Sequence, residues 1–346
     1  MRILYIDAIY QPGHKNFNSK MISAFSKLGE VDILYQNKNI VNENAGTIKN
    51  SFPIKEKFYY KKRFFYKLIY RLKYISMWKW VTDFINRSDY DFYFISYIEP
   101  VSFALGTKKI RKNCGFVDHL YGQTVANKTK FSFFKKINAN LKAGFMEKYI
   151  YEFAKNTGCE NAFYFPHPII DGNFGSSPTG VGAVIAPGGN NDEAFIAQLV
   201  KQSVKLDERL NKKLIIKGQK DFESQKLKIY SGKLSDSEYS KLMSESSAFL
   251  LIYNDDYNLR TSGVFYEAIA LNKIVYLRDN NTMKKINEQF DNVVKCFNTV
   301  DELIDLINGD NSFVDYSEIK REHSEKSVAN YLEVMIESDN ERNHKL

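Results

Sequence analysis

Cysteine is scarce in this chain, and its scarcity argues against two kinds of structure. The 346 residues include three cysteines, Cys114, Cys159 and Cys296. They are odd in number, far apart in the sequence and form no Cys-x-x-Cys pair. Neither a disulfide framework nor a zinc cage is therefore indicated, and the pattern is typical of a protein in a reducing compartment.

Long hydrophobic runs are also missing. No window of the sequence approaches the ~18 apolar residues of a membrane-spanning helix. The N-terminal run from Ile3 to Tyr10 is short, is interrupted by Asp7 and is followed by no small-residue cleavage site. It predicts a first β-strand rather than a signal peptide, so we expect a cytoplasmic protein.

The length and the composition predict a globular protein of two domains. The chain is roughly twice the usual domain size of about 100–200 residues. Hydrophobic residues make up 44% of the sequence and charged residues 26%, values that disfavour global disorder. Strand patterns and helix patterns alternate through both halves, which predicts an α/β fold of two Rossmann-like domains with a cleft between them.

The first half predicts a β-α-β opening and further strands. The expected strands are Ile3–Tyr10, Val31–Tyr35, Asp91–Tyr97 and Gly115–Leu120, and the expected helices include Val101–Lys112 and a long region from Phe131 to Asn156. Since parallel sheets place ligands at the carboxyl ends of their strands, Glu99, Asp118 and His119 become candidate site residues by location. Gly13, in the loop after the first strand, is a weaker candidate for ligand contact.

The second half repeats the alternation after a Pro-His-Pro segment at residues 166–168. The expected strands are Ala183–Ala186, Lys213–Lys217 and Leu227–Tyr230, and the expected helices are Asp192–Leu206, one opened by the capping box of Ser235 and Glu238, and Tyr316–Ile336. A Gly-, Ser- and Pro-rich loop from Gly172 to Gly182 follows this segment. These features predict domains at 1–167 and 168–318 and a C-terminal helix at 319–346.

The segment from Ala248 to Leu277 reads as strand, loop, helix, strand. The apolar run Ala248–Tyr253 enters a polar loop, Thr261-Ser262-Gly263 offers a helix start, and the apolar run Ile274–Leu277 follows. A helix that starts just after a strand presents unpaired N–H groups and a positive dipole end, where a diphosphate can bind. Arg260 would add a bidentate clamp.

This segment resembles the donor-binding segment of nucleotide-sugar glycosyltransferases with the GT-B fold, and among them those of bacterial surface polysaccharides. Many of them carry a Ser-Gly or Gly-rich turn and then a helix with a Glu-Ala pair, whose Glu contacts the donor. The resemblance assigns that role to Glu267. The retaining families commonly carry another Glu eight positions earlier, where this chain has Leu259, so the stereochemical outcome stays open.

The resemblance implies transfer of a sugar from a nucleoside diphosphate sugar to a glycan or polyprenyl-linked glycan acceptor in bacterial surface polysaccharide synthesis. The first domain would hold the acceptor and the second the donor, and the C-terminal helix at 319–346 would cross back to the first domain. The residues predicted to bind the donor are Gly13, Gly188, Gly189, Asn190, Lys217, Tyr253, Arg260, Thr261, Ser262, Gly263 and Glu267. For several of them the structural alternative is a turn or a helix cap.

The chemistry of such a transfer requires an acceptor-activating base if the sugar configuration is inverted. Asp118 is the first candidate, with His119 and Glu99 behind it, because a carboxylate in a cleft can have its pKa raised by burial. No Asp-x-Asp motif flanked by apolar strands is present, since Asp255 and Asp256 are adjacent. We therefore expect no metal and no cofactor, with cations and a helix N-terminus neutralising the diphosphate.

The net charge of +8 is concentrated in one stretch. From Lys55 to Trp80, basic and aromatic residues interleave as KEKFYYKKRFFYKLIYRLKYISMWKW, with Glu56 as the one acid. The stretch predicts either a solvated helix with inward aromatics or attachment to an anionic membrane surface, at ~1 kcal/mol per basic residue. No nucleic-acid recognition motif accompanies the charge.

Two other functions remain open from the sequence. An epimerase of GT-B shape would act on the nucleotide sugar without an acceptor. A binding module would keep the nucleotide pocket without turnover.

Overall fold

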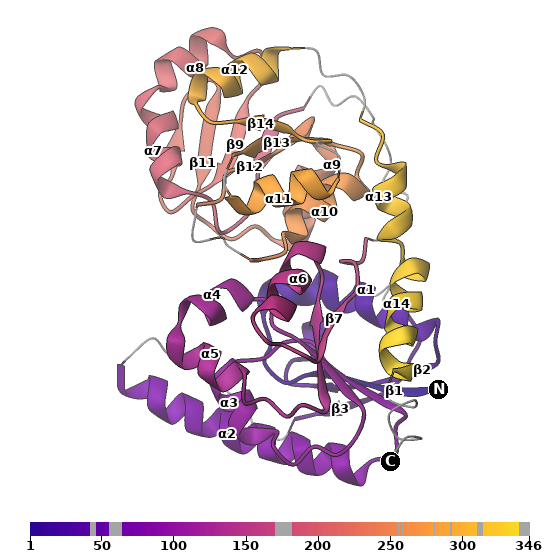
Figure 1. Cartoon of the computed structure of the whole chain (residues 1–346). Coiled ribbons are helices and arrows are strands. Elements are labelled where there is room, and N and C mark those ends of the chain that lie inside the picture. The colour runs from indigo at the N-terminus through magenta and orange to yellow at the C-terminus, as the bar shows by residue number, and fades with distance from the viewer. Residues whose placement is uncertain are drawn as a thin grey trace. The chain divides into compact units, whose positions relative to one another are not determined.

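The computed structural model describes residues 1–41, 46–54, 64–169, 182–254, 257, 259–279, 281–290, 293–309 and 314–338. The chain divides into two compact α/β units (Figure 1). The first unit comprises Met1–Pro168, Leu259–Thr261 and Glu322–Leu346, and the second comprises Ile169–Asn258 and Ser262–Arg321. Residues 55–63 of the basic stretch, residues 172–181 of the predicted loop, Asp255 and Asp256 lie outside the described residues.

The first unit is built on a seven-stranded parallel sheet. Its strands are β1 Arg2–Asp7, β2 Glu30–Tyr35, β3 Ile48–Pro53, β4 Phe92–Ile95, β5 Cys114–Val117, β6 Leu141–Phe145 and β7 Ala162–Tyr164. They are ordered β3-β2-β1-β4-β5-β6-β7, and every neighbouring pair is parallel. The direction of winding reverses between β1 and β4, which is the switch point where open α/β sheets bind ligands.

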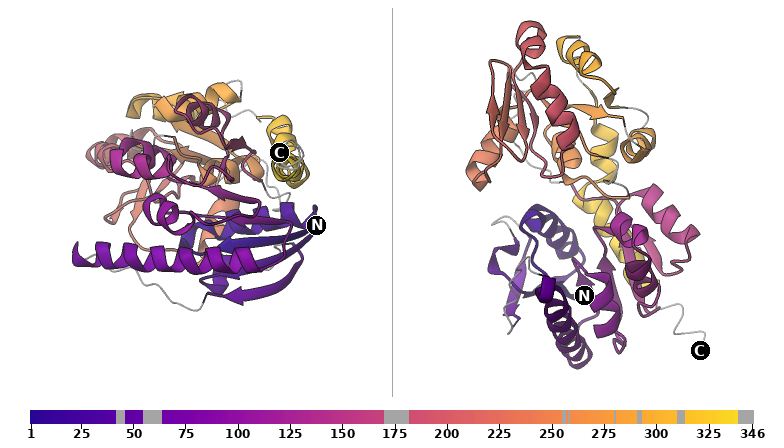
Figure 2. Two further views of the ribbon diagram at one scale, coloured as in Figure 1. Left: turned by 60° about the horizontal axis from the view of Figure 1, so that its bottom comes forward. Right: turned by 90° about the vertical axis from the view of Figure 1, so that its left-hand side faces the viewer.

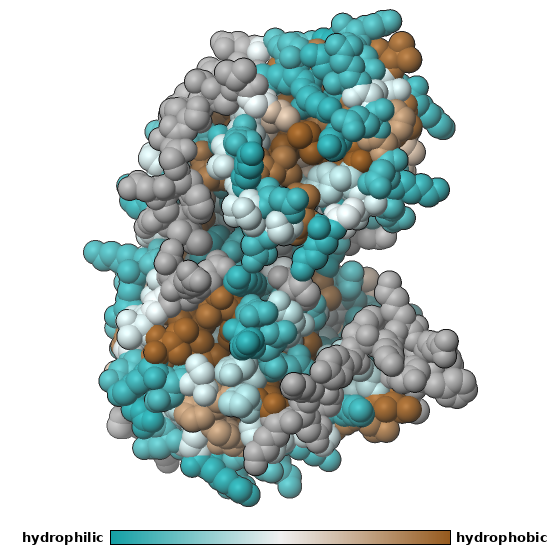
Figure 3. All heavy atoms as spheres, turned by 180° about the vertical axis from the view of Figure 1, so that it is seen from behind, coloured by the Kyte–Doolittle hydropathy of each residue, from teal (hydrophilic) through white to brown (hydrophobic). Residues whose placement is uncertain are grey.

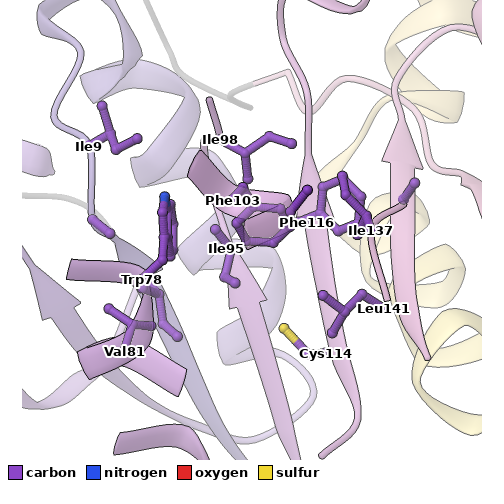
Figure 4. Packing of buried hydrophobic residues seen from close by; sticks show 14 of the residues in the cluster. Ile9, Trp78, Val81, Ile95, Ile98, Phe103, Cys114, Phe116, Ile137 and Leu141 are labelled. Atoms are coloured by element: carbon purple, nitrogen blue, oxygen red, sulfur yellow. The ribbon is translucent and has the colours of Figure 1, made fainter. Parts of the chain in front are cut away.

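Helices cover both faces of this sheet. They are α1 Lys15–Ser26, α2 Phe64–Arg87, α3 Pro100–Gly106, α4 Tyr121–Ala126, α5 Lys128–Phe134 and α6 Lys148–Asn156, with short 3-10 turns at Pro12–His14 and Lys38–Ile40. Apolar residues of α2, α3, α5 and α6 form one core with the sheet. Figure 4 shows part of this core, where Trp78 and Phe103 pack edge to face with ring centroids 4.9 Å apart. Such aromatic pairs add to the stabilisation by area burial.

The structure of this unit differs from the sequence predictions in three places. The region from Phe131 to Asn156 is not one helix, because the buried strand β6 separates α5 from α6. Asn138 breaks the helical pattern by folding its side chain onto the N–H of Asn140, 3.0 Å away. The edge strand β3 is not predicted, since its residues are mostly exposed and carry no apolar alternation. The helix predicted over Val101–Lys112 is shorter and ends at Gly106.

The second unit has a seven-stranded sheet of the same winding. Its strands are β8 Val184–Ala186, β9 Leu214–Lys217, β10 Phe222–Glu223, β11 Leu227–Tyr230, β12 Ala248–Leu251, β13 Ile274–Arg278 and β14 Lys295–Phe297. The order is β10-β11-β9-β8-β12-β13-β14. Only β10 is antiparallel to its neighbour among these described strands. The switch point lies between β8 and β12.

The helices of the second unit flank its sheet, as the right-hand view of Figure 2 shows. They are α7 Glu193–Lys201, α8 Ser203–Arg209, α9 Asp236–Glu245, α10 Gly263–Ala270, α11 Asn281–Gln289, α12 Val300–Asn308 and α13 Ser317–Glu322. Helices α7, α8 and α12 share one core with the sheet. The helix predicted over Asp192–Leu206 is divided at Gln202 into α7 and α8, and the capping box of Ser235 and Glu238 is confirmed.

The C-terminal segment forms two helices rather than the one predicted. Helix α14, Glu325–Glu337, follows α13 and packs against α1 within the first unit (Figure 1). Val328, Leu332 and Met335 of α14 are fully buried in the core that α1 also lines. The side chain of Asn113 donates to the Ile336 carbonyl over 2.8 Å and caps the end of α14. The prediction of two Rossmann-like α/β sheets is confirmed, and among the described helices none could cross a membrane.

Candidate functional site

Two segments that the sequence predicts to bind the sugar donor meet at the switch point of the second sheet. They are the turn at Gly188–Asn190 and the approach to α10. Strand β8 runs into the turn Gly188–Asn190, of which Gly189 and Asn190 are exposed. Strand β12 leads to Tyr253, which forms an isolated antiparallel bridge with Asn191. The Gly turn and the approach to α10 therefore lie beside each other at the carboxyl edge of the sheet, where ligands of open α/β sheets bind.

Asn191 fixes the Gly turn. This side chain is buried, and its Nδ2 donates to the carbonyls of Ala186 and Lys217, both over 2.9 Å. It thereby ties the ends of β8 and β9 together. The residue predicted from the sequence is its exposed neighbour Asn190, because nothing in the sequence distinguishes which of two adjacent Asn side chains turns inward.

Helix α10 begins as the sequence predicts. Ser262 is its N-cap: the hydroxyl is fully buried, accepts from the Phe265 N–H over 3.1 Å and shares a 2.9 Å hydrogen bond with the Tyr253 hydroxyl. This hydroxyl is committed to capping, so the groups that would attract an anion are the backbone N–H groups of the first turn. A Cβ added to Gly263 would meet nothing within 4 Å, which leaves that turn accessible.

Glu267 lies on α10 and is held by a tyrosine. The Tyr239 hydroxyl donates to Glu267 Oε2 over 2.9 Å. Burial raises the pKa of Tyr239, and the nearby Glu267 carboxylate raises it further, so the phenol remains a donor. Glu267 is itself partly exposed, which leaves a carboxylate of fixed direction near the helix start.

Two other predicted donor residues have structural partners. The Lys217 ammonium donates to the carbonyls of Ser231 and Gly232, the latter over 2.7 Å. Tyr253 is buried and stacks on Tyr257 with ring centroids 4.0 Å apart. Both residues thus shape the edge of the sheet.

The remaining predicted donor residues, Gly13, Arg260 and Thr261, belong to the first unit. Leu259 beside them has a left-handed backbone with φ of 50° and is buried in the core that α2 lines. A bulky side chain at positive φ is unusual and indicates that this packing fixes the loop. The position at which the resemblance expects a first Glu is therefore an apolar anchor.

The first unit contains a second cluster of polar and aromatic rings at its own switch point. The rings of His14 and His119 have centroids 4.2 Å apart, and Tyr97 lies 5.3 Å from His14 and 6.0 Å from His119. His14 follows β1, Tyr97 follows β4 and His119 follows β5. We call these three residues the ring cluster. Of its members the sequence analysis names only His119 as a catalytic candidate.

His119 has a defined protonation pattern. Its Nε2 lies 2.9 Å from the Ser96 carbonyl, which can only accept, so Nε2 carries the hydrogen and Nδ1 carries a lone pair. Burial lowers the pKa of His119 well below its usual value, and His14 contributes to the shift. Burial likewise lowers the pKa of His14 to about 4. Both rings are therefore neutral near pH 7, and His119 Nδ1 keeps its lone pair.

The two carboxylates named with His119 already accept local hydrogen bonds. Asp118 Oδ1 accepts from the Leu120 N–H over 3.0 Å and Oδ2 accepts from the Thr124 hydroxyl over 2.6 Å. Burial raises the pKa of Asp118 to about 6. Glu99 caps α3 through a 2.8 Å bond from the Ser102 N–H. Both carboxylates thus order the loops after β4 and β5, which carry Tyr97 and His119 of the ring cluster.

No group of three or more His, Cys, Asp or Glu side chains suited to a metal ion occurs within the described residues.

Comparison with known proteins gives matches at the level of structure alone. No protein-family model and no curated protein sequence matches the chain. A trehalose-6-phosphate structure from E. coli, bound with UDP-2-fluoro glucose, matches with a TM-score of 0.63 and 11% identity, over 98% of each chain. The calicheamicin glycosyltransferase CalG4 matches with a TM-score of 0.53 and 10% identity, over 97% of this chain and 98% of that one. The chain has the GT-B fold.

A further GT-B match is the sucrose-phosphate synthase from Thermosynechococcus elongatus. It has a TM-score of 0.56 and 12% identity, over 98% of this chain and 94% of that one. At such identities the likeness defines the fold, and the function has to be argued from the residues of this chain.

Proposed function

We propose that this protein is a glycosyltransferase that takes its sugar from a nucleoside diphosphate sugar. The observation that carries the proposal is the position of the α10 N-terminus, which follows the switch-point strand β12 and is connected to the Gly188–Asn190 turn through Tyr253. An anionic ligand with a base and a sugar on either side suits such a site. The fold is shared with glycosyltransferases, and one similar structure is bound with UDP-2-fluoro glucose.

On the donor side, the N–H groups of the first turn of α10 bind the diphosphate. The Gly turn allows close approach of the backbone, and Glu267, held by Tyr239, accepts hydrogen bonds from hydroxyl groups of the ribose or the sugar. Tyr253 and Ser262 hold the helix start in place. Preorganised hydrogen-bond donors such as these N–H groups stabilise the charge that develops on a leaving diphosphate.

On the acceptor side, His119 is the candidate base. The lowered pKa keeps the ring neutral near pH 7, so the Nδ1 lone pair is present for an acceptor hydroxyl to hydrogen-bond and to pass its proton to. Tyr97 offers an aromatic face of the kind that packs against the apolar face of a sugar ring. In this proposal Asp118 and Glu99 are positioning residues. The sequence instead ranks Asp118 first as the catalytic base, with His119 and Glu99 behind it.

The proposed acceptor is a glycan or a polyprenyl-linked glycan of a bacterial surface polysaccharide. Its support is the resemblance of the Ala248–Leu277 segment and the aromatic ring of Tyr97 beside His119. Transfer is proposed to need no metal, because the helix dipole and nearby cations neutralise the diphosphate. Transfer rates should be the same in EDTA and in Mg²⁺; loss of activity in EDTA and its recovery with Mg²⁺ or Mn²⁺ would contradict this.

The first experiment measures thermal shifts of the full chain with UDP, GDP, ADP, CDP and dTDP. One nucleotide should give a saturable rise in Tm. Gly263→Pro tests the site, because proline is tolerated at the first helical position and the extended backbone of Ser262, with φ of −98° and ψ of 103°, is compatible with it. The variant removes one N–H donor and should weaken binding about tenfold.

Gly263→Ala is the matched control, since its added Cβ has open space and its N–H remains. It should bind like the wild type. No shift with any of the nucleotides would reject the donor site. A shift without sugar transfer to any glycan acceptor would instead favour a binding module, and turnover of the nucleotide sugar without acceptor would favour an epimerase.

A further inference from the structure

Helix α2 presents apolar side chains to solvent on its outward face. Its inward face packs Tyr74, Met77, Trp78 and Val81 into the core of the first unit. On the opposite side Ile69 is 51% exposed and Leu72 is 58% exposed. Hydrophobic residues reach the surface in separate patches elsewhere too, as the face drawn in Figure 3 shows, so exposure alone marks no site. The exposed apolar residues of α2 differ from the others because lysines accompany them on the same face of the helix.

The exposed residues of α2 form a stripe with cations. Ile69, Leu72 and Lys73 fall at i, i+3 and i+4, and Lys79 and Trp80 continue the same face two to three turns later. Lys73 and Lys79 are exposed and make no ion pair with a described residue. Trp80 is half-buried and borders a hollow of about 300 Å³ together with Asp83 and Arg87. We call Ile69, Leu72, Lys73, Lys79 and Trp80 the α2 stripe.

The neighbouring helices carry further positive charge. Helix α3 packs between α2 and α5, on the same side of the sheet in Figure 1. Lys128 and Lys130 are on α5, and Lys135 and Lys136 follow it. The Lys135 ammonium lies 4.5 Å from the Phe131 ring centroid and that of Lys136 5.7 Å from Phe133. Lysines that lie over phenyl rings keep their charge at the surface.

We infer that the α2 stripe docks onto an anionic lipid surface. Apolar residues between lysines are the composition of helices that lie in the headgroup region, where the apolar side chains insert and the cations pair with lipid phosphates. Trp80 at the end of the stripe fits the same headgroup region, because tryptophan is enriched at membrane–water interfaces. A nucleic-acid surface would match the cations but would leave Ile69 and Leu72 in water, so lipid is the occupant that accounts for both.

Docking of the α2 stripe has a consequence for the sugar acceptor, which rests on the proposed function. Arg71 of α2 lies 3.7 Å from a Glu99 carboxylate oxygen, and Glu99 starts α3 just after Tyr97. An ion pair thus connects the helix that carries the stripe to the residue two positions after Tyr97 of the ring cluster. Docking through α2 would hold a lipid-linked acceptor at the same unit that carries His119.

The test is sedimentation of the full chain with vesicles of phosphatidylglycerol and phosphatidylcholine in equal parts, against vesicles of phosphatidylcholine alone. The wild type should bind the anionic vesicles, and about 0.5 M salt should weaken the binding. Lys73→Glu with Lys79→Glu should weaken it at least about 25-fold, at about fivefold per cation. Ile69→Ser with Leu72→Ser should weaken it about tenfold without changing the charge.

Matched controls lie on the second unit. Lys220→Glu with Lys233→Glu changes the charge equally at exposed positions, and Val204→Ser removes a side chain that is 70% exposed. Both controls should bind vesicles like the wild type. Equal losses in controls and stripe variants would reduce the effect to net charge and overturn the inference, as would absence of binding to anionic vesicles. The nucleotide thermal shift, measured without vesicles, is unaffected by the stripe, so its failure would count against the donor site alone.

Discussion

At the scale of single residues, the side chains of the candidate acceptor site differ in whether local hydrogen bonds already use their acceptor atoms. His119 donates through Nε2 to a carbonyl and keeps a lone pair on Nδ1. Asp118, one residue earlier, uses both oxygens to accept from Leu120 and Thr124. Neighbouring residues therefore have different roles, because the loop after β5 folds one side chain inward and leaves the other beside His14.

This difference predicts opposite sensitivities to substitution. His119→Ala should lower sugar transfer by about 10²–10⁴-fold, the usual contribution of a general base. Asp118→Asn should lower it by less than about tenfold, because the amide oxygen still accepts from the Leu120 N–H. Initial rates with a saturating donor measure both. Neither substitution should change the nucleotide thermal shift, and a larger loss for Asp118→Asn would move the base to Asp118.

Asp7 provides a test of burial through pH. It is 1% exposed, Asn18 donates to it over 3.0 Å, and burial raises its pKa from 3.8 to about 6. Between these values the folded state binds more protons than the unfolded state, so the carboxyl destabilises the fold increasingly as the pH rises from about 4 to about 6. Relative to Asp7→Asn, the wild type should lose up to about 3 kcal/mol over that range.

Urea unfolding of both proteins at about pH 4 and about pH 7 gives the difference directly. The other titrating groups are common to the two proteins and cancel. A difference in unfolding free energy that does not depend on pH would mean that the Asp7 carboxyl titrates at its ordinary value.

At the scale of elements, the sequence predicts the buried parts best. Strands β1, β2, β4 and β9 and the cap of α10 follow from apolar runs and from Ser262, signals that are local in the chain. Strand β3 carries no such signal because it is an exposed edge, and β6 is masked by flanking helical patterns. The ring cluster was not predictable, since His14, Tyr97 and His119 follow three different strands and meet only once the sheet is formed.

Gly144 in β6 has no side chain, and the ring of Phe165 packs closely against it. An added Cβ would lie 2.6 Å from Cε1 of Phe165, which is fully buried, and 3.3 Å from the Phe116 carbonyl. Gly144→Ala should therefore destabilise the protein by about 1–3 kcal/mol through overpacking. Gly13→Ala, in the same unit, meets nothing within 4 Å and should change stability by under about 1 kcal/mol. Chemical unfolding compares them; equal values would mean that Phe165 moves aside freely.

At the scale of the whole molecule, the first unit is completed by the far end of the chain. Helix α14 buries Val328, Leu332 and Met335 against the face that α1 also covers. Lys142 of β6 donates to the Met335 carbonyl, and Asn113 donates to that of Ile336. The core of the first unit thus includes residues more than 150 positions beyond Pro168, and we expect its folding to require α14.

This dependence predicts the effect of truncation. A chain that ends after Ser324 lacks α14, and each large apolar side chain removed from the core costs about 2–5 kcal/mol, so the sum reaches the whole stability of a domain, about 5–15 kcal/mol. The first unit should then unfold and be cleaved within residues 1–168 in limited proteolysis, while the second unit stays protected. A chain that ends after Ser338 keeps all of α14 and should resist the protease like the wild type. If the shorter chain resisted equally, α14 would be an appendage and the core of the first unit would be complete without it.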